Sequence, residues 1–295
     1  GLEFGIDGRP RPDRPFVFTV FSNSSSQRIC RVPFSMFALT EANATYAEFK
    51  VKSQGLALLD NDSRLVEQFR LEQEIQQNIY NEKLVIYSVA THCLANSSNI
   101  GESFKAYELS SALATFCLNL PKSLFNSLKI PEEFHVWGDR VQALKELADP
   151  GFAFFTIAGQ APKYSTGLSV EQWLQEALEN AGLPNLQEIV YLAANQMEEL
   201  ENEIVEGLYS DRLKSLLSIG RNNFTERGIW GQNVLSMENL QKNSIMLPPI
   251  VLGDGFVTPV APKTIPIGQE YMDQWIEQII DIEVSLDRFI RACRF

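Results

Sequence analysis

The spacing of hydrophobic residues changes near residue 63, which predicts strands before that point and mainly helices after it. Short apolar or alternating runs occur at 16–21, 29–39, 46–53 and 55–60. A period of two, with turn-forming residues between the runs, is typical of β-strands. From residue 63 the apolar positions recur mostly at helical spacing, and Asp62 or Ser63 suits the start of a helix.

Two short and nearly continuous apolar runs, 84–94 and 152–158, are interpreted as buried strands. Residues 104–118 have the apolar spacing of a helix. Pro131 suits the first turn of another helix that runs to residue 148, because its fixed φ angle fits there and its missing N–H is not needed.

Capping-box patterns predict the helices that follow. Ser169 and Gln172 open one that ends near Gly182. Asn185 and Glu188 open the longest predicted helix, whose acidic run is expected to be a solvated face, with a cationic partner as the alternative. That run consists of Glu198, Glu199, Glu201, Glu203 and Glu206.

The N-terminal residues 1–15 are predicted to be an extended arm, because three prolines favour polyproline II geometry. Arg9, Arg11 and Arg14 keep this segment hydrated. A floppy terminus is one interpretation. An arm that lies on a neighbouring subunit is the other.

The C-terminal part is predicted to be extended over residues 245–268, with a small hairpin around Asp254 between two glycines. An amphipathic helix then follows to the end of the chain, and its broad apolar stripe includes Trp275, Ile279 and Phe289. A helix with so broad a stripe needs a groove in which to lie.

These patterns predict an α+β fold, with a β-rich N-terminal part, a predominantly helical part and an amphipathic C-terminal helix. The expected regions are the arm 1–15, a β-rich region with one helix at 16–100, a mainly helical region with one buried strand at 101–244, and the proline-rich extension with the final helix at 245–295. A single domain over the whole chain agrees with the pattern equally well.

Composition and charge exclude several classes of function. Hydrophobic residues make up 45% of the 295 residues, which is enough for a sizeable core. The net charge is −12, from 25 Lys and Arg against 37 Asp and Glu, so binding to nucleic acid or anionic lipid is disfavoured. The apolar runs are all too short to span a membrane, and a signal sequence is not found.

The cysteines and the glycosylation sequons indicate different compartments. Cys30, Cys93, Cys117 and Cys293 are scattered and are expected to be buried thiols of a soluble protein, in the cytoplasm or within an assembled particle. The sequons leave a secreted glycoprotein as the alternative, and four of them are expected in surface loops. They begin at Asn23, Asn43, Asn61, Asn96 and Asn223.

Catalytic signatures are weak because the chain has only two histidines. His92 is next to Cys93 in a predicted strand, where neighbouring side chains point to opposite faces, so a Cys–His pair is not expected. Glu132 and His135 have a metal-ligand spacing but lack a second such pair. No catalytic residue, metal or cofactor is therefore predicted.

The segment 159–167 is the best candidate for a small-molecule site, because it lies between a predicted strand and a predicted helix. It lacks the Gly-Lys-Ser/Thr signature of a phosphate-binding loop, and Pro162 removes one backbone donor. The candidate binding residues are Gly159, Lys163, Ser165 and Thr166.

The function predicted from these patterns is that of a structural or assembly subunit, a homo-oligomer that acts through protein–protein contacts in a viral, phage or other multi-protein particle. Extended arms and an amphipathic terminal helix add buried area between subunits without a large globular interface. The predicted interface residues are Arg9, Arg11, Arg14, Trp275, Ile279 and Phe289. The alternative is an enzyme or small-molecule-binding domain with its site near residues 159–168.

Overall fold

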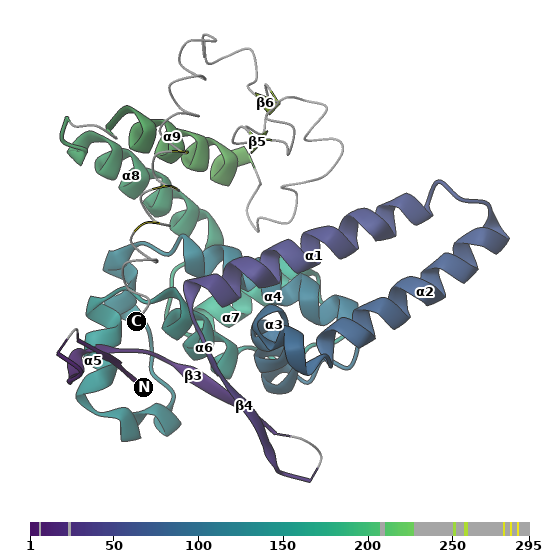
Figure 1. Cartoon of the computed structure of the whole chain (residues 1–295), viewed down its shortest axis with the longest axis horizontal. Coiled ribbons are helices and arrows are strands. Elements are labelled where there is room, and N and C mark those ends of the chain that lie inside the picture. Colours follow the sequence, from purple (N-terminus) through teal and green to yellow (C-terminus); the bar gives the residue numbers. More distant parts are fainter. Residues whose placement is uncertain are drawn as a thin grey trace. The chain divides into compact units, whose positions relative to one another are not determined.

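The computed structural model describes residues 1–5, 7–22, 25–206 and 210–226, the pairs 250–251 and 257–258, and the single positions 280, 284 and 288 (Figure 1). Among these residues, Gly1–Gln196 form one compact unit and Met197–Glu226 belong to a second. The first unit holds both hydrophobic clusters described below. The predicted α+β fold is confirmed, with small β-hairpins before residue 34 and a helical majority after it.

The N-terminal residues form two antiparallel hairpins. β1 (Leu2–Phe4) pairs with β2 (Pro10–Pro15), and β3 (Phe18–Ser22) pairs with β4 (Arg28–Pro33). The segment 1–15 is thus extended as expected, but it folds back on itself through Gly8, whose φ angle is 72°. Glycine suits that turn because it has no Cβ atom to clash in the left-handed region.

The strands predicted at 46–53 and 55–60 are wrong, since helix α1 (Met36–Leu56) covers most of these residues. Its buried side chains include Leu39, Ala42, Tyr46 and Phe49, at intervals of three and four residues that place them on one helix face. The predicted helix that follows is α2 (Asn61–Ile79). Its cap is Asp60 and not the predicted Asp62 or Ser63, because the Asp60 side chain accepts hydrogen bonds from the backbone N–H groups of both residues.

The two predicted buried strands are helices. Residues 84–94 belong to the end of η1 (Glu82–Leu84) and to α3 (Val85–Ser98), and residues 152–158 belong to α6 (Pro150–Gln160). A helix that is buried nearly all round shows no apolar period, so its sequence resembles that of a buried strand. Asp149 and Pro150 are the sequence signals that indicate the start of helix α6. The Asp149 side chain accepts a hydrogen bond from the N–H of Phe152, and Pro150 occupies the first turn.

The remaining elements follow the capping signals. The helix α4 (Ser103–Leu118) is confirmed, but the helix expected from Pro131 to residue 148 is divided at Gly138 into η3 (Glu132–Trp137) and α5 (Asp139–Glu146). The capping box of Ser169 and Gln172 is present at α7 (Val170–Asn180). Asn185 accepts from the N–H of Glu188 at the start of α8, but α1 is longer than α8. The other elements are η2 (Lys122–Ser127), α8 (Leu186–Glu203) and α9 (Ser210–Glu226).

Towards the C-terminus, β5 (Ile250–Val251) pairs with β6 (Val257–Thr258) in the antiparallel sense expected around Asp254. Ile280, Val284 and Arg288 are helical. Asp254 itself and the predicted interface residues Trp275, Ile279 and Phe289 lie outside the described residues. Among the described helices, none combines the length and the apolar character needed to cross a bilayer.

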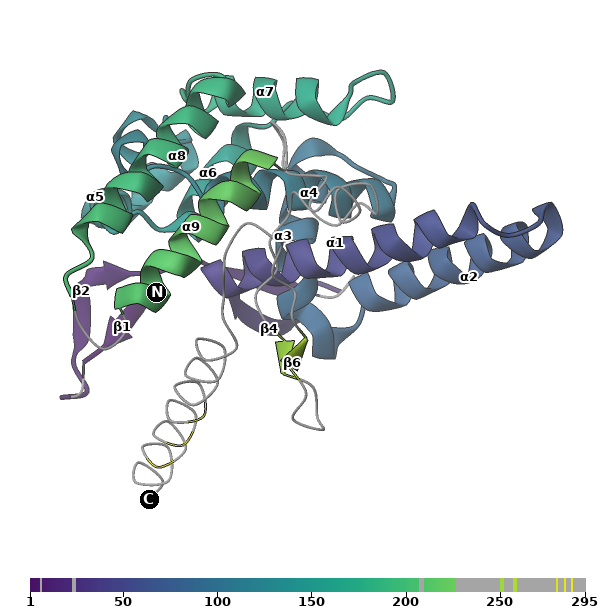
Figure 2. The ribbon, with the colours of Figure 1, turned by 90° about the horizontal axis from the view of Figure 1, so that it is seen from above.

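The main core forms where α1, α3, α4, α6 and α7 meet, and a smaller cluster joins α1, α2 and α4. The side chains of Trp173 and Phe154 are fully buried in the main core, and Phe49 and Tyr107 pack edge to face in the smaller one. Figures 1 and 2 both show the distal ends of α1 and α2, joined by residues 57–60, projecting beyond α3 and α4. The inner halves of α1 and α2 therefore belong to the core, and the outer halves extend from it.

The start of α6 lies against the backbone between β4 and α1. A Cβ atom at position 151 would lie 2.0 Å from the carbonyl oxygen of Phe34, so only glycine allows this approach. The Phe34 ring packs on Phe154 and Phe155, at centroid distances of 5.3 and 5.8 Å. This contact determines where the β3–β4 hairpin leaves the helical core.

Gly151→Ala is expected to destabilise the fold by about 1–3 kcal/mol or more, because Phe34 or α6 must move to admit the methyl group. Gly159→Ala, in the same helix, is the control, since the nearest atom to its Cβ would be Pro131 Cγ at 3.8 Å. The control should be neutral or stabilising by about 0.5–1 kcal/mol. Urea unfolding measures both variants, and equal losses of stability would contradict the close approach at Phe34.

Asp149→Asn is expected to change how stability depends on pH. Burial raises the pKa of Asp149, although the hydrogen bond from the Phe152 N–H opposes this rise. The folded protein therefore retains this proton to higher pH than the unfolded chain does, and stability falls as pH rises through that interval. Asparagine retains the cap and cannot ionise, so the variant should lose less stability as the pH rises above the ordinary pKa of aspartate, about 4. Denaturant unfolding across this range measures the difference, and parallel pH curves would contradict the prediction.

Candidate binding groove

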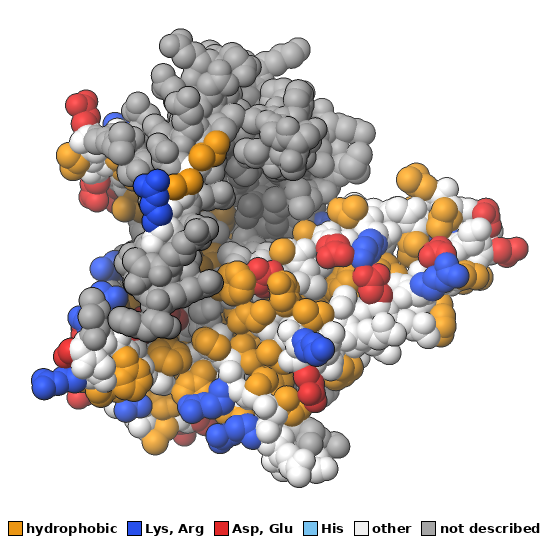
Figure 3. Space-filling view, viewed as in Figure 1, with side chains coloured by type: hydrophobic (Ala, Val, Ile, Leu, Met, Phe, Trp, Pro, Cys, Tyr) orange, Lys and Arg blue, Asp and Glu red, His pale blue; other side chains and the backbone are white. Residues whose placement is uncertain are grey.

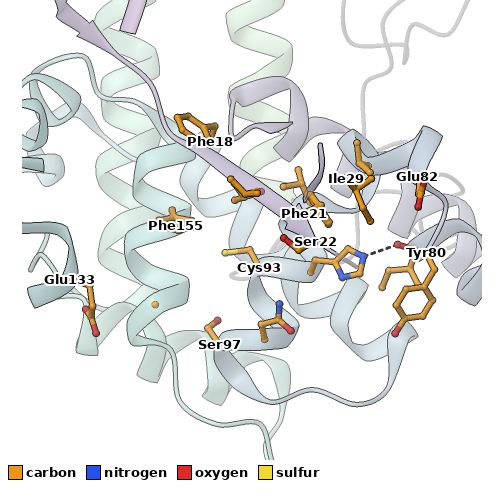
Figure 4. A pocket seen from close by; sticks show the side chains of 18 of the residues that line it. Phe18, Phe21, Ser22, Ile29, Tyr80, Glu82, Cys93, Ser97, Glu133 and Phe155 are labelled. Carbon is orange, nitrogen blue, oxygen red and sulfur yellow. Dashed lines mark hydrogen bonds between the residues drawn. The ribbon is translucent and has the colours of Figure 1, made fainter. Parts of the chain in front are cut away.

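A groove of about 1210 Å³ lies in the first unit, between β3, the end of α2, α3, η3 and α6 (Figure 4). All five residues of β3 line it, and β4 contributes Ile29. Aliphatic and aromatic side chains supply most of the exposed area of the lining, and the aromatic residues are Phe18, Phe21, Tyr80, Phe134 and Phe155. The groove is therefore a mainly apolar surface with one strand along its side.

Stacked aromatic rings hold two of its walls together. Phe134 of η3 stacks on Phe155 of α6 at 5.2 Å and on Trp137 at 4.4 Å between centroids. Phe155 also contacts Phe34, which follows β4 directly. Aromatic pairs of this kind contribute about 0.5–1.5 kcal/mol each beyond their buried area. The hairpin, α6 and η3 are thus linked by one chain of ring contacts.

The edge of β3 borders the groove. Side chains alternate between the two faces of a strand, so a strand that lines a groove with every residue presents its edge. The N–H of Phe34 donates to the carbonyl of Val17 at 2.8 Å, and one step along the ladder Phe18 lies opposite Pro33. Because hydrogen-bonded and non-bonded pairs alternate in antiparallel sheets, Phe18 and Val20 direct their N–H and C=O groups away from β4.

His92 and Cys93 both line the groove from α3, so the expectation that they point to opposite faces of a strand is wrong. The His92 Nε2–H donates to the carbonyl of Ile79 at 2.7 Å, and its ring packs edge to face on Phe21. Figure 4 shows the Cys93 sulfur pointing into the hollow. Burial raises the pKa of the Cys93 thiol to about 12, so at neutral pH it is an apolar group and not a nucleophile.

The charges that line the groove are all negative. Glu82 and Glu133 contribute carboxylates, and no Lys or Arg is among the lining residues that the structure describes. Lys163 is close by, since its Nζ donates to the carbonyl of Ser97 at 2.7 Å, but it does not line the groove. The groove is therefore suited to an apolar partner that carries positive charge.

The segment 159–168 follows helix α6, so the strand-before-loop context expected for a phosphate site is wrong. Gly159 lines the groove, whereas Lys163, Ser165 and Thr166 do not. The loop is held down by the bond from Lys163 to Ser97 and by a bond from Trp173 Nε1 to the Pro162 carbonyl. A role for these residues in ligand binding stays a prediction.

The structure also locates the candidate metal ligands of η3 and the acidic run of α8. Glu132 and His135 are exposed on η3, and the described residues contain no group of three or more His, Cys, Asp or Glu side chains that could hold a metal ion. Within the second unit, Arg221 of α9 pairs with Glu198 at 3.4 Å and with Glu201 at 3.5 Å. Part of the acidic face of α8 is thus neutralised by the chain itself.

The sequons expected in surface loops lie mostly in helices. Asn43, Asn61, Asn96 and Asn223 belong to α1, α2, α3 and α9, and Asn23 lies outside the described residues. Asn43 also accepts a hydrogen bond from Ser111 of α4 at 2.9 Å. Cys30, Cys93 and Cys117 are free thiols. Cys117 is buried as expected, whereas Cys30 and Cys93 are only partly buried because they lie beside the groove.

Comparison with protein-family models, curated proteins and solved structures finds no match for this chain. Sequence reasoning identified β3 from its alternating residues but missed the groove. The available signal for its free strand edge is Pro33. A proline has no N–H to donate, so its partner Phe18 belongs to a pair that is not hydrogen-bonded and directs its own N–H and C=O outward. This argument requires that the pairing of β3 with β4 is already known.

Cys93 is expected to react slowly with iodoacetamide at pH 8, because alkylation requires the thiolate. Peptide-level mass spectrometry should show labelling at least about ten times slower in the folded chain than in the urea-unfolded chain. Equal rates would show an accessible thiolate and contradict the raised pKa of Cys93.

Proposed function

We propose that this chain is an assembly subunit that associates with further copies of itself through the projecting end of the α1–α2 hairpin. The observation that supports this function is that residues 50–70 contain no buried side chain, although nearly all of them are helical. Helices in proteins gain most of their stability from packing an apolar face, which this segment lacks in a single copy.

The projecting end exposes large apolar side chains. Leu58 is 89% exposed, Leu65 is 67% exposed and Phe69 is 60% exposed. We call this group, together with Val51 and Val66, the distal patch. Positions 65, 66 and 69 share one face of α2, whereas the buried Leu71, Ile75 and Ile79 share another. The patch is therefore turned away from the core and is available for contact.

A second copy suits this patch because its charge is balanced locally. The whole chain carries −12, so most of its surface repels a second copy. Within residues 61–70 of α2, however, Asp62 and Glu67 are balanced by Arg64 and Arg70. Figure 3 shows both signs of charge among the hydrophobic side chains of the projecting end.

A two-fold contact follows from the order of these residues. Arg64 and Glu67 lie on either side of Leu65 and Val66. If α2 packs antiparallel on α2 of a second copy around that point, Arg64 of each chain faces Glu67 of the other. Such an isologous interface uses the same patch twice and is the commonest form of homo-oligomer.

The N-terminal arm is a second contact in this proposal, but the structure supports it less. Arg11 pairs with Asp13 at 3.1 Å, and Arg14 pairs with Glu3 at 3.7 Å, so the arm partly neutralises its own charges. Arg9 is 3.9 Å from Asp7. Membership of a viral, phage or other particle is a further part of the proposal, and it rests on the sequence alone.

The double variant Leu65→Glu/Phe69→Glu is expected to weaken self-association, because it places four carboxylates in the two-fold contact. Loss of an interface hot spot costs about 2 kcal/mol or more, which is a factor of about 30 in the dissociation constant. Sedimentation velocity over a range of concentrations measures the effect. Far-UV circular dichroism should remain unchanged.

Gln77→Glu is the matched control, since it adds charge to an exposed position of the same helix outside the distal patch. It should associate like the unmodified chain. A chain that is monomeric at every concentration, or a double variant that associates normally, would refute the proposed assembly role.

A further inference from the structure

We propose that the groove beside β3 binds an extended, positively charged segment of a partner protein, which adds to the β3–β4 sheet as a third strand. This binding activity is separate from self-association, because the groove and the distal patch have no residue in common. The argument rests on the strand edge, the size of the groove, its lining and its charge.

The free edge of β3 supplies the hydrogen bonds. Within the part of the chain that the structure describes, the sheet contains β3 and β4 alone, so the other side of β3 has no neighbouring strand. Phe18 and Val20 present N–H and C=O groups on that side, where the groove lies. An extended peptide can pair with these groups through its own backbone, which is how many peptide-binding domains recognise a strand.

The dimensions suit a peptide better than a small molecule. Small-molecule pockets usually measure about 300–1,000 Å³ and enclose most of the ligand. The groove measures about 1210 Å³ and follows a strand of five residues. At about 3.3 Å per residue, five paired residues span roughly 17 Å.

The apolar lining of the groove explains why apolar and polar side chains should alternate along the bound strand. One face of an added strand would lie over Val89 and Cys93 of α3 and against Phe134 and Phe155, so it needs apolar side chains. The protonated Cys93 thiol is compatible with this, because a neutral thiol behaves as a small apolar group. The other face would point to solvent and accept polar residues.

The negative charge of the groove favours basic residues at the polar positions of the bound segment. Glu82 and Glu133 line it from η1 and η3, at different walls. The nearby cations are engaged elsewhere, since Arg31 lies over the Phe18 ring and Lys163 donates to a backbone carbonyl. Lysine or arginine in the bound segment would therefore be attracted, and acidic residues would be repelled. Together these features specify a segment in which apolar residues alternate with polar ones that include Lys or Arg.

The proposal is tested with a phage-displayed library of random nonapeptides, selected on the full chain and counter-selected on the Val20→Pro variant. Val20→Pro removes an N–H from the free edge and retains the ladder with β4, and proline is tolerated at edge strands for this reason. We expect the selected peptides to alternate apolar residues with Lys or Arg. Synthetic copies should bind the variant at least about ten times more weakly in fluorescence anisotropy.

Arg31→Pro is the matched control for the loss of an N–H, because Arg31 is opposite Val20 on β4 and does not line the groove. It is compared with Arg31→Ala, since both variants lose the guanidinium that lies 3.8 Å from the centroid of the Phe18 ring. It should leave peptide binding within about a factor of two. Gly159→Leu provides a second test that spares the strand, since a side chain at this exposed position of α6 enters the groove and its Cβ atom meets nothing closer than 3.8 Å. It should also weaken binding by about a factor of ten or more.

Three results would overturn the proposal. The selection enriches no peptide, the selected peptides bind Val20→Pro as tightly as the unmodified chain, or the enriched peptides are acidic. Each result is independent of sedimentation behaviour. A chain that self-associates but binds no peptide would retain the assembly role and lose the peptide site.

Discussion

The approach of the Phe34 backbone to Gly151 is the constraint on which the rest of the first unit depends. A side chain at position 151 would collide with the Phe34 carbonyl, so glycine brings the β4–α1 junction and α6 into direct contact. Phe34 then fills the space beside Phe154 and Phe155. From this point β4 leaves in one direction and α1 in the other, so a single contact determines the position of both the hairpin and the projecting helix pair.

Helix α1 belongs to the core at one end and to the projecting helix pair at the other. The part of α1 up to Phe49 buries Ala38, Leu39, Ala42, Tyr46 and Phe49 against the helices of the first unit. Beyond Phe49 this helix has no buried residue, although Leu56 is partly buried, and α2 buries apolar residues only from Leu71 onwards. The apolar residues between these points have little to pack against in one copy. These exposed apolar residues are the reason why we propose the outer part of the helix pair as an association surface.

The groove has a different origin. Its walls are fixed by ring stacking among Phe34, Phe155, Phe134 and Trp137, and its side is a strand whose second edge has no neighbour in the described part of the chain. His92 is held by the Ile79 carbonyl, and Cys93 retains its proton because it is buried. The strand edge is therefore the feature of the groove on which the proposed peptide site rests.

The amino-acid sequence by itself determined the elements that have local signals, such as the β3 and β4 strands and the capping box at Ser169, because these depend on neighbours within a few residues. It predicted strands at 46–53, 84–94 and 152–158, where the tertiary structure has helices. Residues 84–94 and 152–158 lose their helical period because several neighbours cover them, and burial of that kind is decided only when the chain is folded. The groove and the distal patch were decided in the same way, because a free strand edge and an unburied helix face exist only relative to what packs beside them.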